Sequence, residues 1–171
     1  MRKGKPLTQF NIRAAEPGDA EAIKNLAVVN NMFAAEEISF FDELLAGFFN
    51  DSLEGHQWLV ATGYDPSAIL AAAYFAPEPF ADRMWNLYFI ATDPDQHGSG
   101  VGTELIEHVE SELRSSGEDV ARTLIVDTSS LPEYEQARGF YLRRGFVEEA
   151  RVRDFNGPGD DKVTFWKSLV N

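Results

Sequence analysis

The chain contains no cysteine among its 171 residues. This absence excludes disulfide bonds, thiolate metal sites and any mechanism that passes an acyl group through a cysteine nucleophile. No apolar run reaches the roughly 18 residues that a membrane-spanning helix needs. The basic segment Met1–Pro6 also lacks the hydrophobic stretch of a signal peptide. We therefore expect a cytoplasmic protein that has no membrane partner.

Positive charge is also scarce, because 15 Lys and Arg residues face 28 Asp and Glu residues, for a net charge of −13. This balance argues against non-specific binding to nucleic acids or anionic membranes. It favours cationic partners, although acidic residues that merely keep the surface solvated are the preferred explanation over a dedicated groove for a polycation. The three histidines are scattered, without the spacing of metal ligands, so we expect no metal site.

The composition is that of one globular domain, and we assign residues 1–171 to it. Hydrophobic residues make up 44% of the chain, which is enough for a core, and no repeat or low-complexity tract interrupts them.

The longest predicted loops are Pro66–Ser67, Pro77–Asp82 and Asn156–Asp161. Asp19 is predicted to cap the first helix.

A glycine-rich run, Asp93–Thr103, is the most informative segment of the sequence. It follows a strand-like stretch, Trp85–Thr92, and opens a helix whose apolar residues recur at helical spacing. Glycines at alternate positions let the main chain turn tightly and approach an anion closely, while the start of a helix favours negative charge. The run therefore predicts a cradle for phosphate groups.

Two well-known phosphate loops do not fit this run. A P-loop would end in Gly-Lys-Ser/Thr, whereas this chain has Gly102-Thr103. A Rossmann fingerprint has a different glycine spacing and normally follows the first strand of its domain. A glycine-rich turn without any ligand remains an alternative on these residues alone.

The second half of the chain adds a second motif. A buried strand, Leu124–Ser130, is followed by a helical stretch that ends at Gly145-Phe146. With these two motifs the chain resembles the GNAT superfamily of acyl-CoA-dependent N-acyltransferases. The family's phosphate loop, Gln/Arg-x-x-Gly-x-Gly/Ala, is matched by His97–Gly102 except at His97. Its later Ala-x-x-Phe-Tyr-x-x-x-Gly-Phe pattern is matched at Ala137, Phe140, Tyr141, Gly145 and Phe146. Tyr134 stands where the family commonly has an asparagine.

The resemblance implies an α/β (α+β) acyl-CoA N-acyltransferase fold, in which about four helices flank a mixed, mostly antiparallel central sheet of about six or seven strands. Strands are expected near residues 10–14, 57–63, 68–75, 85–92, 122–128, 146–154 and 162–169. Helices are expected near residues 19–31, 40–49, 100–116 and 133–143. The strands that end at Thr92 and near Thr128 should diverge and open a cleft for the acyl thioester.

The implied activity is direct transfer of an acetyl or other acyl group from acetyl-CoA to a primary amine of a small molecule, without a metal. A protein N-terminal or lysine acetyltransferase and a catalytically silent CoA-binding or sensing module are alternatives, and a homodimer stays open. Tyr141 matches the family's tyrosine that gives a proton to the departing thiolate. The residues expected to bind acetyl-CoA are Ile90, Ala91, Thr92, His97, Gly98, Ser99, Gly100, Val101, Gly102 and Thr103.

Other roles follow from residue chemistry within the implied fold. Asp127, at the end of the strand facing the cleft, is the leading candidate for the base that deprotonates the amine, with Glu36 and Glu37 as alternatives. Arg143, Arg144 and His97 are candidate cations for the 3′-phosphate of CoA. The segments Asn31–Phe49 and Asn156–Lys162 are expected to shape the acceptor groove, where Asp160 or Asp161 could meet an ammonium group.

Overall fold

The computed structural model describes residues 10–171, so the basic segment Met1–Pro6 lies outside the described residues. Seven strands and four helices, with three short 3-10 turns, alternate along the chain. The strands are β1 (Asn11–Ala14), β2 (Gln57–Thr62), β3 (Ile69–Pro77), β4 (Met84–Thr92), β5 (Thr123–Ser129), β6 (Val147–Gly157) and β7 (Asp160–Ser168). The helices are α1 (Ala20–Val29), α2 (Phe40–Phe49), α3 (Val101–Ser115) and α4 (Glu135–Arg143). No helix within residues 10–171 has both the length and the apolar character to cross a bilayer.

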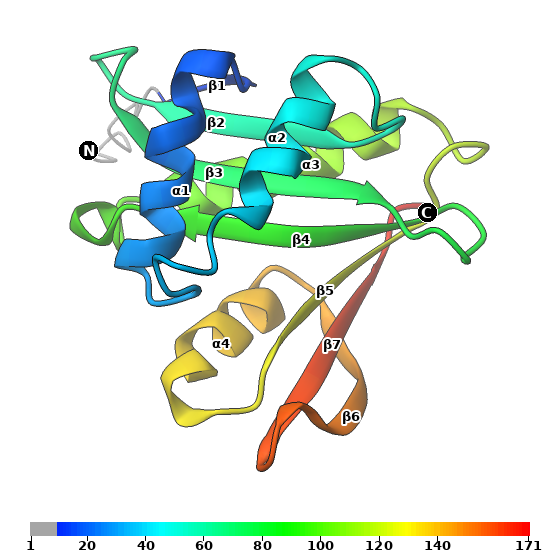
Figure 1. Ribbon diagram of the computed structural model, residues 1–171. Coiled ribbons are helices and arrows are strands. Elements are labelled where there is room, and N and C mark those ends of the chain that lie inside the picture. Colours follow the sequence, from blue (N-terminus) through cyan, green and yellow to red (C-terminus); the bar gives the residue numbers. More distant parts are fainter. Residues whose placement is uncertain (1–9) are drawn as a thin grey trace, which may run out of the picture.

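All seven strands belong to one sheet, in the order β1-β2-β3-β4-β5-β7-β6. Neighbours pair antiparallel except β4 and β5, which are parallel. The predicted mostly antiparallel sheet with four helices is therefore confirmed, and the strand and helix positions agree closely with those expected from the hydrophobic pattern. Figure 1 shows that β5, β7 and β6 swing away from the flatter sheet made by β1 to β4.

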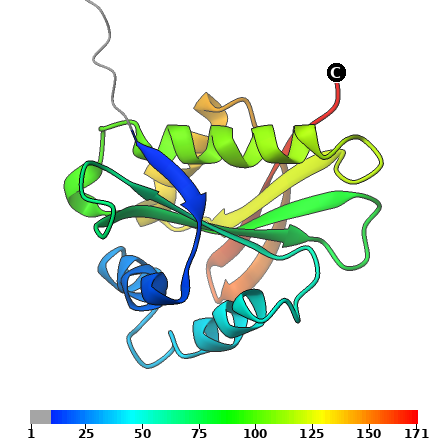
Figure 2. The same cartoon turned by 90° about the horizontal axis from the view of Figure 1, so that it is seen from above.

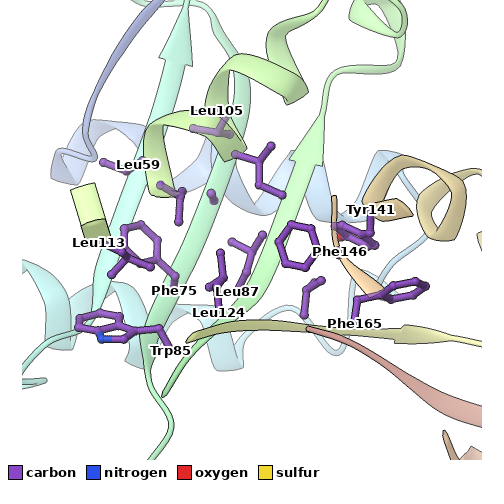
Figure 3. Close-up of a cluster of buried hydrophobic side chains, with 14 of the residues drawn as sticks. Leu59, Phe75, Trp85, Leu87, Leu105, Leu113, Leu124, Tyr141, Phe146 and Phe165 are labelled. Carbon is purple, nitrogen blue, oxygen red and sulfur yellow. The ribbon is translucent and has the colours of Figure 1, made fainter. Parts of the chain in front are cut away.

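Helices cover the two faces of the sheet differently, as Figure 2 shows, with α3 on one face and α1 and α2 on the other. Each face has its own buried apolar cluster. The cluster under α3 extends from Leu59 to Leu124 and on to Tyr141, Phe146 and Phe165 near α4 (Figure 3). The opposite cluster joins α1 and α2 to Trp58, Tyr74 and Phe89. The alternation of side chains along each strand thus assigns every strand residue to one face or the other.

The parallel pair of β4 and β5 is short, and this determines where the sheet opens. The two strands pair only at Met84–Asn86 with Thr123–Ile125, although both continue for several residues. A β-bulge in the β3–β4 ladder, between Tyr74 and Phe75, lies beside this point. Because bulges bend a strand and increase its twist, the bulge helps to turn the end of β4 away from β5. We call the resulting opening, from Leu87 to Thr92 and from Val126 to Ser129, the strand split.

One prediction about local structure was wrong, and another was confirmed only in part. Most of the expected loop at Asn156–Asp161 is a hairpin, since β6 runs to Gly157 and β7 begins at Asp160. The turn needs only Pro158 and Gly159 between the two strands. Asp19 is the N-cap residue of α1, as predicted, but its side chain makes no capping hydrogen bond to the helix. Its carboxylate instead accepts two hydrogen bonds from the Arg13 guanidinium, at 2.7 and 3.1 Å, because this ion pair offers a stronger partner than the helix.

Candidate active site

The glycine-rich run forms the connection between the end of β4 and the start of α3. A 3-10 turn, Pro94–Gln96, follows β4, and the Asp93 carboxylate stabilises it by accepting a hydrogen bond from the Asp95 amide at 2.9 Å. Gly98 and Gly100 then adopt φ angles of +81° and +94°. These left-handed conformations strain any residue with a Cβ atom, which explains why glycine occupies both positions.

Several main-chain donors in this connection have no acceptor. The N–H groups of Gly98, Gly100, Gly102 and Thr103 make no hydrogen bond to any residue in the range 10–171, while the Val101 N–H donates to the Ser99 hydroxyl at 3.3 Å. Unpaired donors at the start of a helix, together with its dipole, stabilise an anion placed there. The 15-residue length of α3 makes this a full helix terminus rather than an isolated turn.

The start of α3 lies directly against the end of β4. A Cβ atom on Gly102 would lie 3.3 Å from the Thr92 hydroxyl, so glycine permits this close approach. The Thr92 carbonyl accepts a hydrogen bond from the Asn30 side chain at 2.9 Å, and the same amide nitrogen donates to Leu26 at 2.8 Å. Asn30 therefore fastens the end of α1 to the end of β4, a contact that the sequence pattern did not indicate.

The end of β4 keeps one free edge. Ile90, Ala91 and Thr92 pair with β3 on one side, and beyond Asn86 no strand pairs with the other side. A free strand edge offers main-chain donors and acceptors to an extended ligand. The free edge and the unpaired donors of α3 thus meet at one end of the strand split, next to each other.

Tyr141 lies on α4 and packs into the cluster under α3. Its ring contacts those of Phe140, Phe146 and Phe165 at centroid distances of 5.5, 5.9 and 5.5 Å, and the residue is only 5% exposed (Figure 3). Its hydroxyl makes no hydrogen bond to any residue that the structure describes. Burial raises the pKa of this hydroxyl above its usual value, so Tyr141 keeps its proton at neutral pH and can act as a donor but not as a base.

Asp127 lies on β5, on the opposite face of the sheet. Leu124 and Val126 point into the α3-side cluster, so Ile125 and Asp127 point to the α1–α2 side. The Thr164 hydroxyl of β7 donates to the Asp127 carboxylate at 2.5 Å and fixes its position. The last paired positions are Asn86 and Ile125, which places Tyr88 and Asp127 each two residues beyond the start of the split.

Tyr88 lies near Asp127 and binds a further carboxylate, Glu78. Its hydroxyl donates to Glu78 at 2.9 Å, and Asn86 donates to the same oxygen at 3.1 Å. Burial raises the pKa of Tyr88, and the charges of Glu78 and Asp127 raise it further. Glu78, Asn86 and Tyr88 were not identified from the sequence, because alternation places Asn86 and Tyr88 on one face of the strand but gives no sign that Glu78, which follows β3, will meet them there.

The other candidate bases and acceptor carboxylates lie in less favourable surroundings. Glu36 and Glu37 are exposed between α1 and α2, and Glu37 accepts a hydrogen bond from the Ala34 amide at 3.1 Å. The two aspartates that are candidates to meet an ammonium group already accept hydrogen bonds, one from β5 and one from β6. Asp160 accepts from the Ser129 hydroxyl at 2.5 Å, and Asp161 accepts from the Asp154 amide at 3.0 Å.

The candidate cations for CoA differ in their contacts. His97 is exposed beside the free N–H groups. Arg143 is exposed on α4, whereas Arg144 lies 3.6 Å from Glu107 on α3 and is partly neutralised by it. His97 and Arg143 therefore have more freedom than Arg144 to meet a phosphate.

Two other features bear on the location of the site. Within residues 10–171, the structure contains no group of three or more side chains arranged to hold a metal ion. A surface hollow of about 530 Å³ lies along the second half of α3, between His108 and Trp85. Its lining includes a His108–Glu112 pair at 3.3 Å, but the hollow is separated from the glycine connection by most of the helix, so the strand split remains the candidate site.

Comparisons with known proteins identify the family of the chain. A family model described as an acetyltransferase (GNAT) domain matches residues 54–148, which include β4, the glycine connection, α3, β5 and α4. No curated protein matches the chain.

Solved structures share the fold over nearly their whole length. A GNAT-family protein from Desulfovibrio desulfuricans is 28% identical, with a TM-score of 0.83 and coverage of 95% of this chain and 100% of that chain. Spermidine N-acetyltransferase from Vibrio cholerae, solved with CoA and spermine, is 19% identical, with a TM-score of 0.75 and coverage of 94% and 96%. The ribosomal-protein-S18-alanine N-acetyltransferase from Escherichia coli is 20% identical, with a TM-score of 0.71 and coverage of 95% and 96%. The family model covers more than half of the sequence, and the chain therefore belongs to the GNAT family of acetyltransferase enzymes.

Proposed function

We propose that this protein is an N-acetyltransferase that moves an acetyl group from acetyl-CoA directly to a primary amine of a small molecule. The observation that carries the proposal is that unpaired helix N–H groups and a free strand edge meet at one end of the strand split, and we add to them the buried Tyr141 hydroxyl, which has no hydrogen-bond partner among residues 10–171. The first two suit the diphosphate and the amide-containing arm of CoA, and the third suits its sulfur.

Acetyl-CoA, when bound, supplies an acyl group activated as a thioester. The N–H groups of Gly98, Gly100, Gly102 and Thr103 would hold its diphosphate, with Ser99 and Val101 completing the connection and His97 beside it. The backbone of Ile90, Ala91 and Thr92 would orient the pantetheine arm. The carbonyl of Thr92 is already used by Asn30, which leaves the N–H groups and the Ile90 carbonyl for this role.

Asp127 is proposed to accept the proton that the amine loses. A lysine-type amine has a pKa of about 10.4, so removing its proton at pH 7 costs roughly 4.6 kcal/mol, whereas an α-amine with a pKa near 8 costs about 1.4 kcal/mol. A base held at the site therefore matters most for a strongly basic acceptor. Thr164 holds Asp127 on the face of the split away from Tyr141, which separates the base from the acid.

Tyr141 is proposed to hold the proton that neutralises the departing thiolate. For free groups, a phenol near pKa 10 would protonate a thiolate near 8.5 at a cost of about 2 kcal/mol. Burial raises the pKa of Tyr141, but burial also raises the pKa of a thiol in the same surroundings, so the difference between them changes less than either value. Holding the hydroxyl in place then makes the transfer feasible.

The comparisons support acetyl transfer as the reaction, and the acceptor amine has to be identified by experiment. The neighbours with printed acceptors are named for aminoglycosides, for spermidine or for an alanine of ribosomal protein S18. A direct test mixes the protein with acetyl-CoA and a panel of primary amines and follows free thiol. Amine-dependent thiol release supports the proposal, and release only with peptide amines would assign a protein acetyltransferase. Tight CoA binding without release would identify a sensing module and refute the proposed catalysis.

A further inference from the structure

The α1–α2 face of the strand split carries two carboxylates without a cationic partner. Glu78 and Asp127 are both half-buried, and neither forms a salt bridge with any residue in the range 10–171. The charges of both act on the Tyr88 hydroxyl, so Tyr88 lies close to each of them. Burying unpaired carboxylates costs free energy, which a positively charged ligand would recover.

Glu78 is held firmly in this position. Its amide donates to the Met84 carbonyl at 2.8 Å, and one of its carboxylate oxygens accepts the hydrogen bonds from Tyr88 and Asn86. The other carboxylate oxygen has no donor among the described residues. Two donors thus orient the group while one oxygen remains available to a ligand, as expected of a recognition site and not of a flexible surface acid.

The Asn86 amide provides an independent sign of a ligand. Asn86 is only 3% exposed, and while its nitrogen donates to Glu78, its buried Oδ1 has no donor within residues 10–171. A buried amide oxygen without a partner costs about 1–3 kcal/mol, so such groups are rare in the absence of a function. An ammonium group beside Glu78 could supply the missing donor after a small adjustment of the side chains.

Aromatic rings form the wall next to these acids. Tyr88 stacks on Tyr74 at 5.6 Å between centroids, and Tyr74 stacks on Trp58 at 4.6 Å. Burial raises the pKa of Tyr74 to about 12, so this ring stays neutral. Tyr88 is 46% exposed, and its electron-rich ring lies beside the two acids, where it would attract a cation.

We propose that Glu78, oriented by Tyr88 and Asn86, binds a second positive charge on the acceptor, so that the preferred substrates are diamines or polyamines. This inference rests on the proposed function. One nitrogen of the acceptor loses its proton near Asp127 and reacts, and another stays protonated and pairs with Glu78. Glu78 is therefore a specificity-determining residue, and a monoamine lacks the group that it recognises.

The experiment compares 1,4-diaminobutane with butylamine, which has the same carbon chain and one amine fewer. Glu78→Gln keeps the size of the side chain and removes its charge, and Glu149→Gln on exposed β6 serves as a charge-matched control. Both the KM in the thiol-release assay and the Kd by calorimetry in the presence of CoA are measured. In Glu78→Gln, we expect both constants for the diamine to rise about 10- to 100-fold, as for loss of a charge-assisted hydrogen bond.

The same substitution should change the KM for butylamine less than about threefold, and Glu149→Gln should change neither amine, because the effect depends on the second charge. Tyr88→Phe removes one of the donors that orient Glu78 and should cause a smaller loss of diamine affinity. An equal fall in kcat for both amines would overturn the proposal, because it would identify Glu78 as the proton acceptor. An unchanged Kd for the diamine would also overturn it, because it would show that Glu78 does not bind the second positive charge. If no amine releases thiol from the wild type, the proposed function fails, whereas the calorimetry still decides whether Glu78 binds the second charge.

Discussion

Replacing Gly100 by alanine tests whether the main chain before α3 binds the diphosphate of CoA. Gly100 has a φ of +94° and a ψ of 0°, and a Cβ atom built on it would meet no other atom within 4 Å. The substitution therefore adds backbone strain without a steric clash. For a single residue held in the left-handed region, the cost is about 1–2 kcal/mol.

Gly117 offers a matched control at the other end of the same helix. Its φ is +91°, and its added Cβ atom would also meet nothing within 4 Å. Gly117→Ala should thus lower the free energy of unfolding by a similar 1–2 kcal/mol, roughly the cost of the conformation alone. Because Gly117 lies beyond Ser115, at the end of α3 opposite to the free N–H groups, its substitution should leave CoA affinity within about twofold.

Gly100→Ala should differ from this control in binding. Relief of the strain rotates the peptide groups on both sides of residue 100, and these include donors that have no acceptor in the described chain. If the rotation costs 1.4–2.8 kcal/mol of diphosphate binding, the Kd for CoA rises about 10- to 100-fold. Urea unfolding and calorimetry with CoA measure the two effects separately. Equal CoA affinity in the two variants would refute the assignment of the glycine connection to the diphosphate.

Three further substitutions test individual side chains. Tyr141→Phe should lower kcat by about 10- to 1000-fold with little change in the Kd for CoA, and unchanged turnover in the thiol assay would remove Tyr141 from the mechanism. Asp127→Asn should lower kcat/KM more for a lysine-type amine than for an α-amine, because the first needs a base more; an equal loss for both would argue against a base. Asp19→Asn should cost about 1–3 kcal/mol of stability at pH 7. The hydrogen bonds from Arg13 lower the pKa of Asp19, so its contribution is full above the unfolded pKa near 3.9 and disappears as the pH falls through the folded value. Urea titrations at several pH values should show wild type and Asp19→Asn converging in acid, and a constant difference would contradict the ion-pair argument.

The fold could be predicted closely where short-range pattern determines structure. The apolar spacing from Val101 to Leu113 gave α3 within one residue at each end, and the run Phe40–Phe49 gave α2 without error. The hairpin at Gly157–Asp160 was predicted as a loop because its composition is rich in glycine, proline and aspartate. The cross-strand hydrogen bonds of β6 and β7 extend to the turn itself, and this pairing cannot be read from composition.

The candidate site likewise has one part that the sequence predicts and other parts that it does not. The phosphate-binding connection is local, since glycine conformations and a helix start determine it, and the sequence indicated it directly. Asn30 and Thr92 meet across 62 positions of the chain, and nothing near either residue predicts the contact. Glu78 and Tyr88 are closer in sequence, but their contact depends on the pairing of β3 with β4, which brings the end of β3 beside Asn86 and Tyr88. Such pairs depend on tertiary geometry, which a single sequence does not specify.

The contacts of the hydroxyl groups around the strand split also bear on whether the acyl group is transferred directly or through an acylated side chain. The Ser129 hydroxyl donates to Asp160 and accepts from the Leu131 amide, and the Thr164 hydroxyl donates to Asp127. These groups are therefore occupied, and no histidine lies hydrogen-bonded to either of them in residues 10–171 to activate a nucleophile. Tyr141, which keeps its proton, is equally unsuited to accept an acyl group. With the acid on the α3 side and the carboxylates on the α1–α2 side, the thioester and the amine can approach the split from opposite faces at the same time. The proposed reaction is for this reason a single direct transfer within a ternary complex.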